Sequence, residues 1–167
     1  MSGELTLFVY GTLMAREVFF TVVYGDKDPP QKICDLHTFT PSVLKDFRRH
    51  RVKNVKYPAA VPEAGQKITG LLVTGLTDAM IQKLDCYEGP DYERRSVRVQ
   101  VLGKIGSNGF LGEEIGTSVY EFLKLDDLEL RDWDFEEFRQ ERKAIWTRRY
   151  LAPQVCPTVD SFQIVHR

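Results

Sequence analysis

The sequence predicts an α+β fold: a small, mostly antiparallel β-barrel with two or three flanking helices. Segments with the pattern of strands outnumber those with the pattern of helices, and hairpin-like connections join many of them. The 167 residues suit a single domain, with a core over about residues 5–146 and a C-terminal extension over residues 147–167. Hydrophobic residues make up 43% and charged residues 28%, so an ordinary globular core is expected.

The first predicted strand runs from Leu5 to Tyr10 and ends at Gly11. Apolar or aromatic side chains can line both of its faces, which is typical of a strand buried on both sides. A glycine directly after such a strand marks either a positive φ or a close approach to the main chain. The amides of the turn at Gly11 and Thr12 can form an anion site, although this stretch alone favours a plain strand-to-helix turn.

Residues 17–24 fit either a short helix or a strand, and a helix is favoured because residues 14–17 precede it. Periodicity and capping predict further helices over residues 77–87, with Thr77 as the N-cap, and from Asp132 or Asp134 to Trp146. Two prolines confine residues 57–62 to an edge or loop position, and residues 103–116 form a long loop or a wide hairpin. Strands are expected over residues 35–39, 41–47, 67–76, 92–102, 116–123 and 161–165.

The net charge of −1 gives no overall field that would hold nucleic acid or an anionic membrane. The basic stretch Arg48–Lys56 could contact nucleic acid, but it lacks interleaved aromatic residues, and a solvated strand or hairpin is the favoured interpretation. No run reaches the ~18 apolar residues that span a bilayer, and the N-terminus lacks a signal-like pattern. We therefore expect a soluble, cytoplasmic protein with neither nucleic acid nor membrane as a partner.

Glu88 is the candidate for acid–base chemistry. It ends a predicted helix beside Gly89, with apolar neighbours before it and Tyr92 after it. Partial desolvation and a helix carboxyl end both disfavour a negative charge, so the pKa of this carboxyl should rise towards neutrality. Such a group can accept a proton and later return it. The alternative, an exposed glutamate at a helix terminus, is the more probable interpretation of these residues alone.

Other chemistry has weaker support. The cysteines, Cys34, Cys86 and Cys156, have neither Cys-x-x-Cys spacing nor a nearby histidine pair, which argues against zinc. The histidines have no serine in a Gly-x-Ser-x-Gly elbow to pair with. Cys86 is interpreted as a buried, inert thiol rather than a nucleophile, and Asp85 as a surface or helix-terminus charge.

Several short motifs in a fixed order carry a resemblance to a known family. Their order and spacing together are more specific than any one of them. They are Phe8-Val9-Tyr10-Gly11-Thr12-Leu13, Tyr57-Pro58-Ala59, Gly70-Leu71-Leu72, Leu84-Asp85-x-x-Glu88-Gly89, Tyr92-x-Arg94-x-x-Val97-x-Val99 and Asp132-Trp133-Asp134-Phe135-Glu136-Glu137-Phe138. The chain resembles the gamma-glutamyl cyclotransferase-like superfamily, and within it the avirulence-induced-protein-like branch, close to gamma-glutamylamine cyclotransferases.

The resemblance implies an acyltransferase-type enzyme with a small gamma-glutamyl substrate and no metal or other cofactor. Glu88 matches the family's catalytic glutamate, which moves protons while the substrate's α-amino group attacks its own γ-carbonyl and releases 5-oxoproline. The resemblance assigns substrate binding to Tyr10, to the turn amides of Gly11, Thr12 and Leu13, and to Tyr92. The leaving group and the oligomeric state are not predicted. The alternative is a non-catalytic ligand-binding or stress-response interaction module on the same fold.

Overall fold

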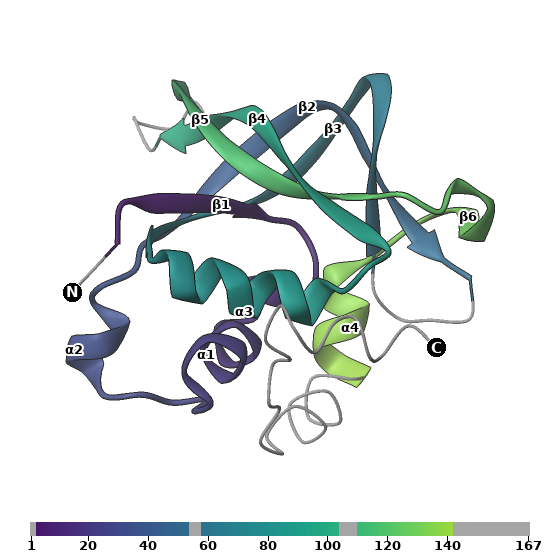
Figure 1. Cartoon of the computed structure of the whole chain (residues 1–167). Coiled ribbons are helices and arrows are strands. Elements are labelled where there is room, and N and C mark those ends of the chain that lie inside the picture. The colour runs from purple at the N-terminus through teal and green to yellow at the C-terminus, as the bar shows by residue number, and fades with distance from the viewer. Residues whose placement is uncertain (1–2, 54–57, 104–109, 142–167) are drawn as a thin grey trace.

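The computed structural model describes residues 3–53, 58–103 and 110–141 (Figure 1). Six strands in this part of the chain form a mostly antiparallel sheet in the order β1-β3-β5-β4-β2-β6, in which only the β3–β5 pair is parallel. A further pairing of β2 with β3 closes four strands into a partial ring rather than a complete barrel. The strands are β1 (Leu5–Val9), β2 (Phe39–Val52), β3 (Pro58–Leu76), β4 (Tyr92–Gly103), β5 (Phe110–Phe122) and β6 (Leu128–Asp132).

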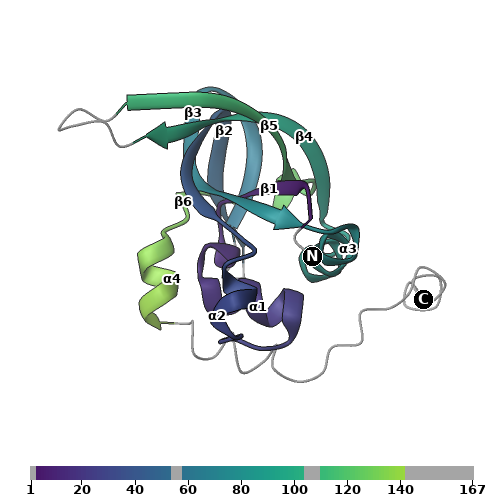
Figure 2. The same cartoon turned by 90° about the vertical axis from the view of Figure 1, so that its left-hand side faces the viewer.

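The helices gather on one side of the sheet, which confirms the α+β class (Figures 1 and 2). Thr77 caps α3 as predicted, because its side chain accepts a hydrogen bond from the Met80 amide at 3.2 Å. Asp134 does the same for α4 by accepting from the Glu137 amide at 2.8 Å. The helices are α1 (Arg16–Tyr24), α2 (Gln31–Cys34), α3 (Asp78–Glu88) and α4 (Phe135–Glu141), with 3₁₀ turns η1 (Thr12–Met14) and η2 (Leu125–Asp127).

Strands β2 and β3 are longer than the sequence predicts. The basic stretch continues the preceding extended residues into a single strand β2, and the proline-bearing segment opens the central strand β3, so its predicted edge or loop position is wrong. Pro58 is the first residue of β3, and Pro62 lies opposite Phe47, where the register shifts. Strand starts and irregular positions are places where a missing amide proton is tolerated.

Strand β1 is buried on both faces, as its sequence predicts. Leu7 and Val9 pack in a cluster with residues of α1 and α3, while Phe8 and Tyr10 pack with residues of the strand ring. All four are at most 6% exposed. The segment that ends in Gly11 is therefore fixed by both halves of the hydrophobic core.

Some sequence predictions fall on residues that the structure does not describe. These are the C-terminal extension, the strand over residues 161–165, the last residues of the helix predicted to end at Trp146, residues 104–109 of the predicted loop, and residues 54–57, where the basic stretch ends and the proline-bearing segment begins. Strands β4 and β5 pair as an antiparallel hairpin on either side of residues 104–109, so residues 110–116 belong to β5, as in the wide-hairpin alternative. Strand β6 was not predicted. Among the described residues, no helix combines the length and hydropathy needed to cross a membrane.

Candidate active site

A cavity of about 160 Å³ lies between the turn after β1 and the end of α3. It brings together all six residues to which the sequence analysis gives a role: Tyr10, Gly11, Thr12, Leu13, Glu88 and Tyr92. Residues of β1, β3, α3 and β5 complete its wall. These further residues are Phe8, Val9, Pro58, Tyr87 and Tyr120.

Gly11 is required by a close approach rather than by a positive φ. Its φ is −126°, but a Cβ built on it would lie 2.5 Å from Cγ of Pro58 and 2.9 Å from Cδ of the same ring. The first backbone bond within the following turn is donated by Met14 to the Gly11 carbonyl, at 3.0 Å. The amides of Gly11, Thr12 and Leu13 precede that bond and take no part in it, so they can serve as donors on the cavity wall.

Glu88 is the last residue of α3 and lines the same cavity as the turn. Burial raises the pKa of its carboxyl to about 8, and the negative charge of Asp85 acts in the same direction. The residue keeps part of its surface accessible, as expected for a group that faces a cavity. Near neutral pH, both the protonated and the ionised form are accessible to it.

Three hydroxyl contacts tie the cavity walls to one another. The Tyr10 hydroxyl donates to the Tyr120 carbonyl at 2.6 Å, and the Tyr92 hydroxyl donates to the Pro58 carbonyl at 2.7 Å. Oγ1 of Thr12 and the Tyr87 hydroxyl lie 2.7 Å apart and share a hydrogen bond. Each contact joins segments at least 34 residues apart in the chain, so the shape of the cavity depends on the assembled fold.

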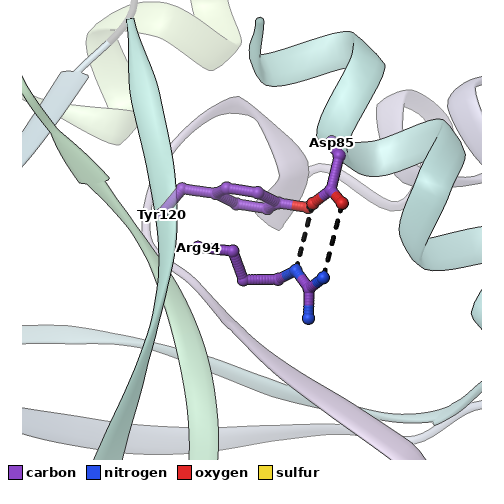
Figure 3. Close-up of polar contacts among 3 residues, drawn as sticks. All are labelled: Asp85, Arg94 and Tyr120. Atoms are coloured by element: carbon purple, nitrogen blue, oxygen red, sulfur yellow. Dashed lines mark hydrogen bonds and ion pairs between the residues drawn. The ribbon is translucent and has the colours of Figure 1, made fainter. Parts of the chain in front are cut away.

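Asp85 is more than the surface charge that its position in the sequence suggests. The Tyr120 hydroxyl donates to Oδ1 of Asp85 at 2.7 Å, and Nε of Arg94 donates to the same oxygen at 3.1 Å (Figure 3). Tyr120 is 3% exposed, and burial, followed by this hydrogen bond, raises the pKa of its phenol. Asp85 therefore links α3, β4 and β5 beside Glu88.

Sequence reasoning missed Tyr120, Tyr87 and Pro58 as wall residues. Tyr87 and Pro58 lie inside motifs that carry the family resemblance, but the resemblance gives neither of them a role. Tyr120 had no local signal. It reaches the cavity only because the parallel pairing of β5 with β3 brings Glu121 opposite Ala60.

The other candidate groups lie in structural contacts. Nδ1 and Nε2 of His37 face the Thr74 carbonyl and the Tyr24 hydroxyl. Cys86 is half-buried and disulfide-bonded rather than the buried, inert thiol that the sequence predicts, so it supplies no thiolate. Within the described part of the chain, no group of three or more His, Cys, Asp or Glu residues could hold a metal ion.

The basic stretch is engaged by acidic residues of the strand that follows η2. Arg48 pairs with Asp132 at 2.9 Å and Arg51 with Glu129 at 3.7 Å. The Lys53 ammonium donates to the Asp126 carbonyl at 3.0 Å. These contacts support the interpretation of the stretch as a strand that is part of the fold.

Comparison with known proteins gives a consistent result. The family model described as "Gamma-glutamyl cyclotransferase, AIG2-like" matches residues 7–140. "AIG2-like protein D" of Arabidopsis thaliana is 36% identical over 144 residues, which cover 84% of each chain. "AIG2-like protein C" of the same organism is 29% identical over 173 residues, covering 98% of this chain and 91% of the relative.

Solved structures agree with this assignment. A solution structure from Arabidopsis thaliana superposes with a TM-score of 0.59 at 27% identity, covering 90% of this chain and 82% of the other. A solved "Gamma-glutamyl cyclotransferase" shares the fold with a TM-score of 0.51 at 12% identity, over 90% of this chain and 88% of the other. Since the family model spans most of its length, the chain belongs to the AIG2-like gamma-glutamyl cyclotransferase family.

Proposed function

We propose that this protein is a gamma-glutamyl cyclotransferase that releases 5-oxoproline from a small gamma-glutamyl amine or amino acid. One observation carries the proposal: Glu88, a carboxyl whose pKa burial raises to about 8, lines the same cavity as the Tyr10–Leu13 turn. The family to which the chain belongs suggests the class of reaction, and the cavity is the site where we propose that the reaction occurs. We place the reaction in the cytoplasm.

In this proposal, the turn binds the α-carboxylate of the gamma-glutamyl group. The amides of Gly11, Thr12 and Leu13 are donors that a carboxylate can accept from, and the close fit of Gly11 to Pro58 fixes their position. The cavity has a volume of about 160 Å³, and both the turn and Glu88 line it. The Tyr10 and Tyr92 rings form its walls, since both phenol hydroxyls donate to backbone carbonyls.

Glu88 then acts first as a base and afterwards as an acid. An α-ammonium beside this carboxyl favours the ionised form, which takes one proton and leaves a neutral amine. The amine nitrogen attacks the γ-carbonyl carbon and forms the fifth bond of the ring. The bond from that carbon to the leaving amine breaks as Glu88 returns its proton to the departing nitrogen. The ionised Glu88 then takes the second proton from the ring nitrogen and passes it to the released amine, which leaves as an ammonium ion. Orientation provides most of the help in such a ring closure.

The direct test is product analysis for 5-oxoproline across a panel of gamma-glutamyl amines, amino acids and peptides. The wild-type protein should release 5-oxoproline from at least one class, and Glu88→Gln should lose at least about a hundredfold in kcat. Asp91→Asn is a matched control, because Asp91 pairs with Lys124 and is not among the residues that line the described cavity.

Two results would contradict the proposal. Turnover that persists in Glu88→Gln would remove Glu88 from the mechanism. A wild-type protein that binds 5-oxoproline, as a thermal shift detects, but that forms no product from the whole panel would identify a ligand-binding module instead of an enzyme.

A further inference from the structure

Arg49 is a half-buried cation in the last third of β2, one residue after Arg48, which is also half-buried. Its Nη1 donates to the Tyr10 carbonyl at 2.8 Å, across 39 residues of sequence. The two neighbouring arginines point to different partners, since Arg48 pairs with Asp132 and Glu63. Arg49 thus contacts the backbone of the cavity turn without being among the described residues that line the cavity.

Arg49 is held in place by the acidic-aromatic segment, residues 132–138, which begins at the last residue of β6. The Trp133 ring is 5% exposed and lies with its centroid 5.3 Å from the guanidinium carbon, a cation–π distance. The Trp133 amide also donates to the Arg49 carbonyl at 3.4 Å. Burial lowers the pKa of Arg49, and the charges of Asp134 and Asp132 oppose this effect. A charged guanidinium in this position is therefore compensated.

The contact has a defined effect on the next amide. The Tyr10 carbonyl and the Gly11 N–H belong to one peptide unit, and the described chain contains no cis peptide bond. In a planar trans peptide these two groups point in opposite directions. A carbonyl held by Arg49 therefore directs the Gly11 N–H away from Arg49. Glycine would otherwise allow this peptide to rotate easily. The charge-assisted bond also polarises the peptide and strengthens its N–H as a donor.

We propose that Arg49 is a positioning residue for the carboxylate of the gamma-glutamyl group: by holding the Tyr10 carbonyl, it fixes the Gly11 N–H as a donor at the cavity. This inference rests on the proposed function, because it concerns the same site. It assigns a role in that site to a residue of the basic stretch and, through Trp133, to the acidic-aromatic segment. Arg49 acts through the turn and does not touch the substrate.

The test compares Arg49→Met with Arg48→Met on a substrate that the wild-type protein turns over. Methionine keeps the apolar stem and removes the charged donor in both variants. Arg49→Met should raise KM about tenfold with a smaller change in kcat, because a hydrogen bond to a charged group is lost. Arg48→Met should leave both constants near the wild-type values.

A substrate pair separates positioning from a general loss of structure. The wild-type protein should discriminate between a gamma-glutamyl substrate and the analogue whose α-carboxylate is an α-carboxamide. Arg49→Met should weaken binding of the carboxylate form and reduce this discrimination about tenfold, whereas a merely structural defect would affect both substrates equally. Discrimination as strong as in Arg48→Met would overturn the inference.

A binding measurement covers the case in which the wild-type protein releases no product, which would count against the proposed function alone. The Gly11 amide resonance should shift when 5-oxoproline is added to the wild-type protein and to Arg48→Met, and this response should be lost in Arg49→Met. An unchanged Gly11 resonance in the wild-type protein would overturn the inference. If Arg49→Met does not fold, Arg49→Lys replaces it. Lysine lacks the planar guanidinium fork, so Arg49→Lys should partly lose the substrate discrimination and the Gly11 response. Wild-type values of both would contradict the positioning role of Arg49.

Discussion

Asp85 precedes Glu88 by three residues on α3, so two carboxyl groups lie about one helical turn apart beside the cavity. They have opposite surroundings. Asp85 accepts hydrogen bonds from Tyr120 and Arg94, while Glu88 is desolvated and has a pKa of about 8. This division provides one carboxyl that holds the site together and one that can exchange a proton.

The pH dependence of catalysis should report Glu88. The base must be ionised, so kcat/KM should rise with pH through a midpoint near 8, the pKa of Glu88 in the free protein. Asp85→Asn removes the second cause of the raised pKa while keeping an acceptor for Tyr120, so this midpoint should move to lower pH. Asp78→Asn changes the same charge at the other end of α3 and should leave the midpoint in place. An unshifted midpoint in Asp85→Asn would contradict the electrostatic coupling.

The stability of the protein should also depend on Glu88. Between pH 4.5 and about 8, the folded state keeps the Glu88 proton that the unfolded state has lost, so the free energy of unfolding falls as pH rises. Below this window both states are protonated, and above it both are ionised. Glu88→Gln removes the effect, so it should be more stable than the wild-type protein above pH 8, by on the order of 5 kcal/mol. Urea unfolding at several pH values measures the difference, and a constant difference would refute its assignment to Glu88.

Gly11→Ala should disturb both the fold and the turn. The added Cβ would lie 2.5 Å from Cγ of Pro58, within a rigid ring, and overpacking of this kind costs about 1–3 kcal/mol. Urea unfolding measures the loss, and product release measures the effect on the site. Gly116→Ala is the control, since its Cβ would lie 3.9 Å from Nη1 of Arg98, an ordinary contact.

The double variant Gly11→Ala/Pro58→Ala tests the cause of that loss. Removing Cγ and Cδ of Pro58 eliminates the two atoms that the new Cβ would strike, so part of the stability should return. Strictly additive effects of the two substitutions would show that the loss at Gly11 has another origin.

Tyr120→Phe should cost about 1–3 kcal/mol of unfolding free energy, because it removes a buried donor to the Asp85 carboxylate. The same substitution in an Asp85→Asn background should cost less, since the remaining acceptor is neutral. Urea unfolding of the four proteins completes a double-mutant cycle. A coupling free energy indistinguishable from zero would mean that the hydroxyl contributes nothing through Asp85.

Local patterns predicted the parts of the fold that local physics decides. The two-sided strand β1, the Thr77 cap and the helix ending at Glu88 follow from periodicity and capping chemistry within a few residues. The prolines at 58 and 62 led to a wrong prediction of an edge or loop position. A strand tolerates proline at its first residue or where the register shifts, and the shift beside Phe47 can be seen only once the strands are paired.

The sequence likewise predicted some residues of the site and not others. The turn and Glu88 carry motifs, and the structure places them around one cavity. Arg49 belongs to an alternating basic stretch that predicts outward-facing cations, and its burial depends on Trp133, 84 positions later in the chain. Tyr120 likewise meets Asp85 across 35 residues. Contacts of this range are set by the topology of the sheet and leave no local periodicity.

Strand β1 packs into two separate core clusters, one on each face, and the cavity turn is its direct continuation. A fluctuation large enough to displace the turn must break both clusters, so the β1 amides that pair with β3 should exchange with solvent slowly. The part of the cavity wall that the turn forms is therefore preorganised, so a ligand that binds there does not have to bear the cost of ordering it.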